Sequence, residues 1–134
     1  MLGDPSQPSV PKTVLIVEDN ELNLKLLNDA LEYHGYTVFT TRLGEPALEL
    51  ARQHRPDLIL MDIQLPDISG MEATRRLKAD EQTRTIPIIA VTAFAMSGDE
   101  AKILASGCDA YVSKPINVLE FLKLVEQWTA VKRD

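Results

Sequence analysis

The stretch VLIVEDN, residues 14–20, decides how the rest of the chain is interpreted. Its apolar residues follow one another without a polar interruption and end at two carboxylates. Such a run is typical of a central strand in a parallel sheet covered by helices on both faces, because a half-exposed strand would alternate between apolar and polar residues. Similar runs recur along the chain, and together they predict five strands: TVLIV at 13–17, TVFT at 37–40, DLILM at 57–61, IPIIAV at 86–91 and AYVS at 110–113.

Between these runs the apolar residues recur at helical spacing. We expect Gly35 and Gly107 to end helices in a left-handed conformation and Asn117 to cap the last helix. A fourth helix is expected at about residues 98–106. The buried positions of the other four are predicted to be Leu22, Leu26, Leu27, Ala30 and Leu31; Ala47, Leu48 and Ala51; Met71, Thr74 and Leu77; and Val118, Phe121, Leu122 and Val125.

Strands and helices that alternate with short loops indicate a parallel sheet with right-handed crossovers. We therefore predict an α/β fold, a (βα)5 doubly wound, flavodoxin-like sandwich. Its five-stranded parallel sheet has the order 2-1-3-4-5, with helices on both faces. Residues 13–130 form this domain, residues 1–12 form a flexible N-terminal tail rich in Pro and Ser, and residues 131–134 form a C-terminal tail.

Composition limits the classes of function. The 134 residues include 14 Lys and Arg against 20 Asp and Glu, which gives a formal net charge of −6. This negative balance argues against binding to nucleic acid or to an anionic membrane surface. The chain also lacks the roughly 20 consecutive apolar residues of a membrane span. The single cysteine, Cys108, cannot form an intramolecular disulfide, so we expect a cytoplasmic protein.

Polar side chains follow the predicted strands where a doubly wound sheet places its ligand site, beyond the carboxyl ends of the strands. They are Glu18, Asp19, Asp62, Thr92 and Lys114. Three clustered carboxylates are costly to bury without positive charge, and oxygen ligands favour a hard cation such as Mg2+. Carboxylates for a metal, a hydroxyl and an ammonium group outline a site for phosphoryl transfer, with Asp62 as the attacking carboxylate.

Four blocks of sequence closely resemble the receiver domain of two-component response regulators. They are VLIVEDN at 14–20, LILMDIQLPDISG at 58–70, AVTAF at 90–94 and AYVSKP at 110–115. The second block contains the run of Asp62, Pro66 and Gly70 that marks the family. VEDNELN, VTAFAM and the Gly-Cys-Asp-Ala-Tyr stretch are most similar to the DivK-type single-domain regulators of cell-cycle and division phosphorelays. The resemblance covers residues 12–130.

The resemblance implies a role for each matching residue. Asp62 would accept the phosphoryl group. Asp19, Asp62 and the backbone carbonyl of Gln64 would ligate Mg2+, for which Mn2+ can substitute, and Glu18 would act partly through water. Three further residues would respond to the phosphoryl group or support the site: Lys114 would contact a phosphate oxygen, Thr92 would shift towards another, and Tyr111 would turn inward, although an edge-strand aromatic can simply pack. The family also has a cis peptide before Pro115.

The expected function is therefore a signalling receiver that catalyses only its own phosphorylation and dephosphorylation. Its partners would be a histidine kinase, a histidine phosphotransfer protein or both, and the chain would be a monomer or a weak dimer. A phosphatase of the phosphoaspartyl type is disfavoured because Gln64 stands where such an enzyme needs an acid-base carboxylate. A phosphorylation-independent scaffold and a receiver excised from a hybrid histidine kinase remain as alternatives.

Overall fold

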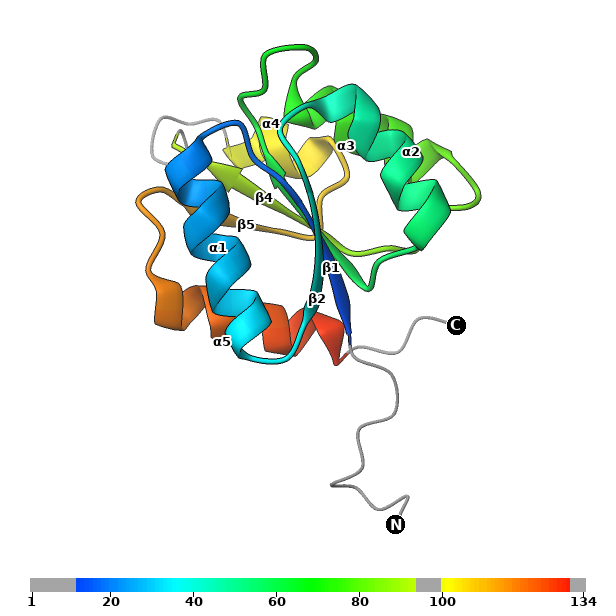
Figure 1. Cartoon of the computed structure of the whole chain (residues 1–134). Helices are drawn as coiled ribbons and strands as arrows, with labels where there is room; N and C mark the ends of the chain where they lie inside the picture. The colour runs from blue at the N-terminus through cyan, green and yellow to red at the C-terminus, as the bar shows by residue number, and fades with distance from the viewer. Residues whose placement is uncertain (1–11, 94–99, 131–134) are drawn as a thin grey trace.

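Strands and helices alternate along the whole of the computed structural model, which describes residues 12–93 and 100–130 (Figure 1). The elements are β1 (Thr13–Val17), α1 (Glu21–Tyr33), β2 (Thr37–Thr41), α2 (Gly44–His54), β3 (Leu58–Asp62), α3 (Gly70–Ala79), β4 (Ile88–Thr92), α4 (Glu100–Ala105), β5 (Ala110–Ser113) and α5 (Val118–Thr129). All strand pairs are parallel, and the sheet order β2-β1-β3-β4-β5 confirms the predicted α/β fold.

The uninterrupted apolar runs divide their side chains between two cores, because successive residues of a strand point to opposite faces. On one face Val14 and Ile16 pack beneath α1 and α5. On the other face Leu15 and Val17 pack beneath α2, α3 and α4. Figure 1 shows the same two layers of helices. Burial on both faces explains why these strands lack alternation.

Helix α1 differs from its prediction. Leu27 and Leu31 are buried as expected, but Leu22 and Leu26 are 79% and 47% exposed. Leu24, which the prediction left out, packs against the core instead. The buried stripe of α1 is therefore Leu24, Leu27 and Leu31, at spacing i, i+3 and i+7, and the assignment of Leu22 and Leu26 to it was wrong.

The other helices largely follow the sequence pattern. Ala47, Leu48 and Ala51 of α2 are buried, as are Phe121 and Val125 of α5. The Asn117 side chain caps α5 by accepting a hydrogen bond from the backbone N–H of Glu120 at 3.1 Å. Gly35 and Gly107 follow α1 and α4 with φ angles of +91° and +106°, which residues with a Cβ rarely adopt.

Five strand boundaries differ from the prediction by one or two residues, since β2, β3 and β4 also end one residue later than predicted, at Thr41, Asp62 and Thr92. β3 begins at Leu58 rather than at residue 57, and β4 begins at Ile88 rather than at residue 86. Pro87 has no N–H to give to the ladder, although its carbonyl accepts a hydrogen bond from the backbone N–H of Ile59 at 3.0 Å. The predicted tails, apart from Lys12, and the start of the predicted 98–106 helix lie outside the described residues; the Lys12 carbonyl accepts a hydrogen bond from the backbone N–H of Thr37 at 2.9 Å. Within the described part, no helix is long and apolar enough to cross a membrane.

Candidate functional site

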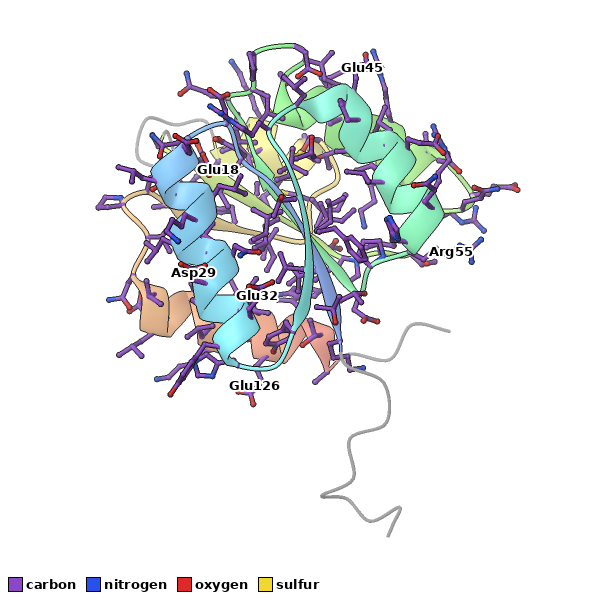
Figure 2. The ribbon with its side chains drawn as sticks, viewed as in Figure 1. Glu18, Asp29, Glu32, Glu45, Arg55 and Glu126 are labelled. Carbon is purple, nitrogen blue, oxygen red and sulfur yellow. The ribbon has the colours of Figure 1, made fainter. Side chains whose placement is uncertain are left out.

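The carboxyl ends of β1, β3 and β5 bring together three of the predicted residues. Glu18 follows β1, Asp62 is the last residue of β3, and Lys114 follows β5. β1 and β3 are neighbours in the sheet, at the point where the strand order reverses, and a doubly wound sheet places its ligand site there. Figure 2 shows Glu18 where β1 leads into α1.

Lys114 joins the two buried carboxylates. Its Nζ atom lies 3.1 Å from Asp62 Oδ2 and 3.4 Å from Glu18 Oε2. The backbone N–H of Gln64 donates a hydrogen bond to Asp62 Oδ1 at 3.0 Å, and the backbone N–H of Asn20 donates one to Glu18 Oε2 at 3.1 Å. The cluster therefore holds two carboxylates against one ammonium group.

Glu18 is buried with only one of its two carboxylate oxygens hydrogen-bonded. Only 1% of its surface is exposed, and its Oε1 atom accepts no hydrogen bond from residues 12–93 or 100–130. Burial raises the pKa of Glu18 from 4.5 to about 7, and Asp62 acts in the same direction, because its negative charge favours a protonated Glu18 that can donate a hydrogen bond to it. An unpartnered, buried carboxylate oxygen is a site at which a cation would be stabilising.

Asp19 is paired with Arg42 rather than with Lys114. Its carboxylate is 3.8 Å from the guanidinium of Arg42, and about half of its side chain is exposed. Accordingly, residues 12–93 and 100–130 contain no preformed cluster of three or more His, Cys, Asp or Glu side chains around one metal position. The donors available nevertheless fit Mg2+, since they are carboxylate oxygens and one of them, Glu18 Oε1, has no partner within the part of the chain that the structure describes.

The remaining predicted residues surround the cluster. Thr92 ends β4 and is buried, and its backbone carbonyl accepts a hydrogen bond from the N–H of Lys114 at 2.8 Å. Pro66 lies in the loop between β3 and α3, and Gly70 begins α3. The Lys114–Pro115 peptide bond is cis.

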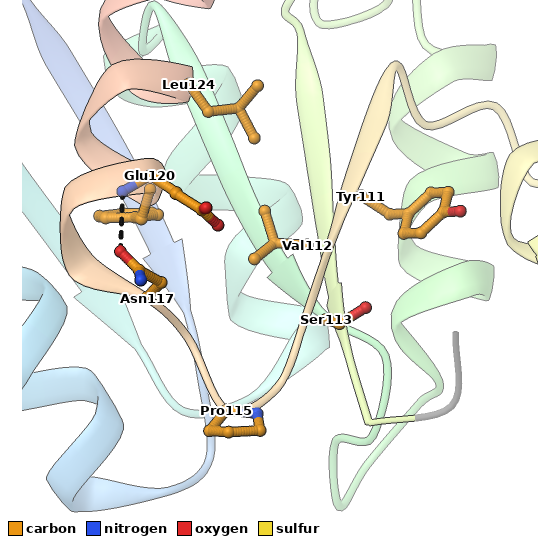
Figure 3. Close-up of a pocket in the computed structure, with 8 residues that line it drawn as sticks. Tyr111, Val112, Ser113, Pro115, Asn117, Glu120 and Leu124 are labelled. Atoms are coloured by element: carbon orange, nitrogen blue, oxygen red, sulfur yellow. Dashed lines mark hydrogen bonds between the residues drawn. The ribbon is translucent and has the colours of Figure 1, made fainter. Parts of the chain in front are cut away.

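Tyr111 lies on the face of the molecule formed by α4 and β5. Its hydroxyl donates a hydrogen bond to the carboxylate of Glu100 in α4. Figure 3 shows the Tyr111 and Val112 side chains on opposite sides of β5. A groove of about 470 Å3 borders this strand and α5, and Tyr111, Pro115 and Glu120 are among its lining residues.

Two residues near the site were not found from the sequence. Asp67 accepts hydrogen bonds from the backbone N–H groups of Gly44 and Glu45, at the start of α2. Arg42 Nε donates a hydrogen bond to the backbone carbonyl of Asp19 at 3.1 Å. The sequence did contain one indication of the role of Asp67. Leu43, at the N-cap position of α2, has no side-chain acceptor, so the first N–H groups of this helix need an acceptor from elsewhere.

Comparisons with known proteins agree with this geometry. The profile of the response regulator receiver domain matches residues 14–126. The chain is 59% identical over 119 residues to the polar-differentiation response regulator DivK of Brucella anthropi, which covers 89% of this chain and 97% of that protein. For DivK of Brucella ovis the identity is 59% over 117 residues, covering 87% and 95%.

A solved structure extends the likeness to three dimensions. The receiver domain of the sensor histidine kinase PA1611 from Pseudomonas aeruginosa, crystallised with a magnesium ion coordinated in its active-site cleft, superposes with a TM-score of 0.85 at 36% identity. The match covers 91% of this chain and all of that one. With a receiver profile over most of its length and close DivK relatives, this chain belongs to the response regulator receiver family and is a receiver of the DivK type.

Proposed function

We propose that this receiver accepts a phosphoryl group on Asp62 in a reaction that requires Mg2+. The observation that carries the proposal is the buried cluster of Glu18, Asp62 and Lys114 with its unpartnered carboxylate oxygen. Glu18, Asp19, Asp62 and the backbone carbonyl of Gln64 would hold the metal. Bound there, Mg2+ supplies positive charge that offsets the charge of the phosphoryl oxygens.

The phosphoryl donor would be a phosphohistidine of a histidine kinase or a phosphotransfer protein. One Asp62 oxygen forms a bond to phosphorus as the phosphorus–nitrogen bond of the donor breaks, and the electron pair of that bond returns to the imidazole. Lys114, now 3.1 Å from Asp62, is placed to meet an oxygen of the transferred group. The Thr92 hydroxyl, at the end of the next strand, would contact another.

The output would be a change in protein binding. A new dianionic group on Asp62 would draw Lys114 and Thr92 towards it, and their strands connect the site to the face that bears Tyr111. Turning of Tyr111 would break its hydrogen bond to Glu100 and reshape the groove beside β5. A partner protein that binds one shape of this groove more tightly than the other would respond to the phosphorylation state of Asp62.

Intact-protein mass spectrometry after incubation with acetyl phosphate tests the proposal. We expect the wild-type protein to gain one phosphoryl group with Mg2+ and none with EDTA, and Asp62→Asn to gain none. Asp29→Asn is the matched control, because it removes an exposed aspartate of α1 that lies outside the site. No mass gain in the wild type under any condition would favour the scaffold alternative, and a gain in Asp62→Asn would move the acceptor elsewhere.

A further inference from the structure

We propose that the β2–α2 turn, residues 41–45, is a positioning element that sets the spacing of the two loops carrying the predicted metal ligands, and that Asp67 is its principal contact. The turn itself supplies no ligand. This inference rests on the proposed function, because it concerns the geometry of the same site.

The turn first holds the loop after β1. The backbone N–H of Glu18 donates a hydrogen bond to the carbonyl of Thr41 at 3.1 Å. Arg42 Nε donates one to the carbonyl of Asp19, also at 3.1 Å. The Thr41 hydroxyl fixes the turn internally by accepting a hydrogen bond from the N–H of Leu43 at 3.3 Å. Glu18 and Asp19, two consecutive predicted metal ligands, are thus hydrogen-bonded through their backbone atoms to the turn residues Thr41 and Arg42.

The same turn holds the loop after β3. The two carboxylate oxygens of Asp67 accept hydrogen bonds from the N–H groups of Gly44 at 2.8 Å and Glu45 at 2.7 Å. Desolvation acts to raise the pKa of the exposed Asp67, but these backbone donors outweigh it and hold the pKa below its ordinary value. Asp67 therefore stays ionised and serves as the cap that Leu43 cannot provide.

Close packing reinforces this contact. A Cβ atom built on Gly44 would lie 2.7 Å from Cγ1 of Ile68 and 3.3 Å from Cδ1 of Leu65. The absence of a side chain at Gly44 therefore lets the loop after β3 approach the first turn of α2.

Gln64 lies between these contacts and the phosphoacceptor. Its N–H is fixed to Asp62 on one side, and Leu65, Asp67 and Ile68 are anchored to the turn on the other. The carbonyl of Gln64 is thereby restricted in where it can point. Residues that orient metal ligands in this way affect metal affinity by about 10- to 100-fold when they are changed.

Isothermal titration calorimetry with Mg2+ alone tests this role. We expect Asp67→Ala to weaken Mg2+ binding by about tenfold and Asp67→Asn, which keeps one acceptor oxygen, by a smaller factor. Glu21→Gln is the matched control for charge, since it removes one exposed carboxylate beside the other ligand loop without touching the turn. Ser69→Ala is the control for capping, since Ser69 caps α3 from the same loop.

Urea unfolding without metal provides the second measurement. A purely structural Asp67 would lower the stability of its variants, as we expect for Ser69→Ala, and leave the Mg2+ dissociation constant of the folded protein unchanged. Equal Mg2+ affinity in wild type and both Asp67 variants would overturn the positioning role of the turn and leave the proposed function unaffected. No Mg2+ binding by wild type would overturn the proposed function as well. If Asp67→Ala does not fold, Asp67→Asn carries the comparison.

Discussion

Among the side chains that the structure describes, Glu18 has a strongly altered ionisation, because it is buried beside a second carboxylate. Its pKa of about 7 in the folded protein lies above its ordinary value of 4.5. Between these two pH values the folded state binds more protons than the unfolded state, so the free energy of unfolding falls as the pH rises. A raised carboxyl pKa therefore destabilises the metal-free protein at neutral pH.

We predict that metal-free protein loses about 1 to 3 kcal/mol of stability between pH 4.5 and pH 7.5 through this group. Glu18→Gln keeps the shape of the side chain and removes the titration, so its stability should depend less on pH. Urea unfolding in EDTA at several pH values measures the difference. Glu21→Gln, an exposed residue of the first turn of α1, serves as the control. Parallel curves for wild type and Glu18→Gln would contradict the prediction.

The uninterrupted apolar runs of the strands explain why most of the strands and helices could be predicted from the sequence. Five apolar segments and two glycines at helix ends define the sheet and most helix boundaries. Leu22 and Leu26 show where this reasoning fails, because a helix with leucines around much of its circumference does not say which stripe faces the sheet. The grouping of Glu18, Asp62 and Lys114 was predictable because each of them ends a strand or directly follows one.

Contacts between loops could not be predicted in the same way. Asp67 meets the start of α2 more than 20 residues earlier in the chain, and Arg42 meets Asp19 across a similar separation. Sequence spacing carries no information about such pairs until the fold is known. The missing cap at Leu43 indicated only that some acceptor was required.

The junction of β3 and α3 depends on a close approach of two backbones. A Cβ atom on Gly70 would lie 2.0 Å from the carbonyl oxygen of Asp62 and 2.9 Å from the Cα atom of Ile63. Both atoms belong to the main chain at the end of β3, so neither can move aside without displacing Asp62. The glycine of the Asp-x-x-x-Pro-x-x-x-Gly run is thus required by space at the start of α3.

We predict that Gly70→Ala lowers the free energy of unfolding by about 3 kcal/mol or more. Gly44→Ala is the matched comparison, since its Cβ meets only side-chain carbons of Ile68 and Leu65, and we expect a loss below about 2 kcal/mol. Urea denaturation of both variants measures which substitution lowers the free energy of unfolding more. A Gly70→Ala protein as stable as Gly44→Ala would show that the backbone adjusts easily.

For the molecule as a whole, binding of a cation at the site should stabilise the fold. The chain has a net charge of −6, and the cluster concentrates two carboxylates against one lysine. We predict that Mg2+ at a hundred times its dissociation constant adds about 2.7 kcal/mol to the free energy of unfolding, and that EDTA removes this gain. Thermal unfolding at increasing Mg2+ concentration measures it.

General screening of the acidic surface must be separated from this effect. Sodium chloride at matched ionic strength should raise the melting temperature much less than Mg2+ does, and Asp62→Asn should lose most of the Mg2+ response. An equal shift in both salts, or an unchanged response in Asp62→Asn, would show that stabilisation comes from screening.

The pairing of Lys114 with residues far earlier in the chain also determines when the cluster of Glu18, Asp62 and Lys114 is completed during synthesis. Lys114 follows Asp62 by 52 residues and Glu18 by 96. While the ribosome still holds β5, Asp62 has been translated but has no lysine beside it and no completed sheet edge around it. Under the proposed function, a nascent chain that lacks β5 would therefore not accept a phosphoryl group, so a phosphohistidine donor would react only with completed protein.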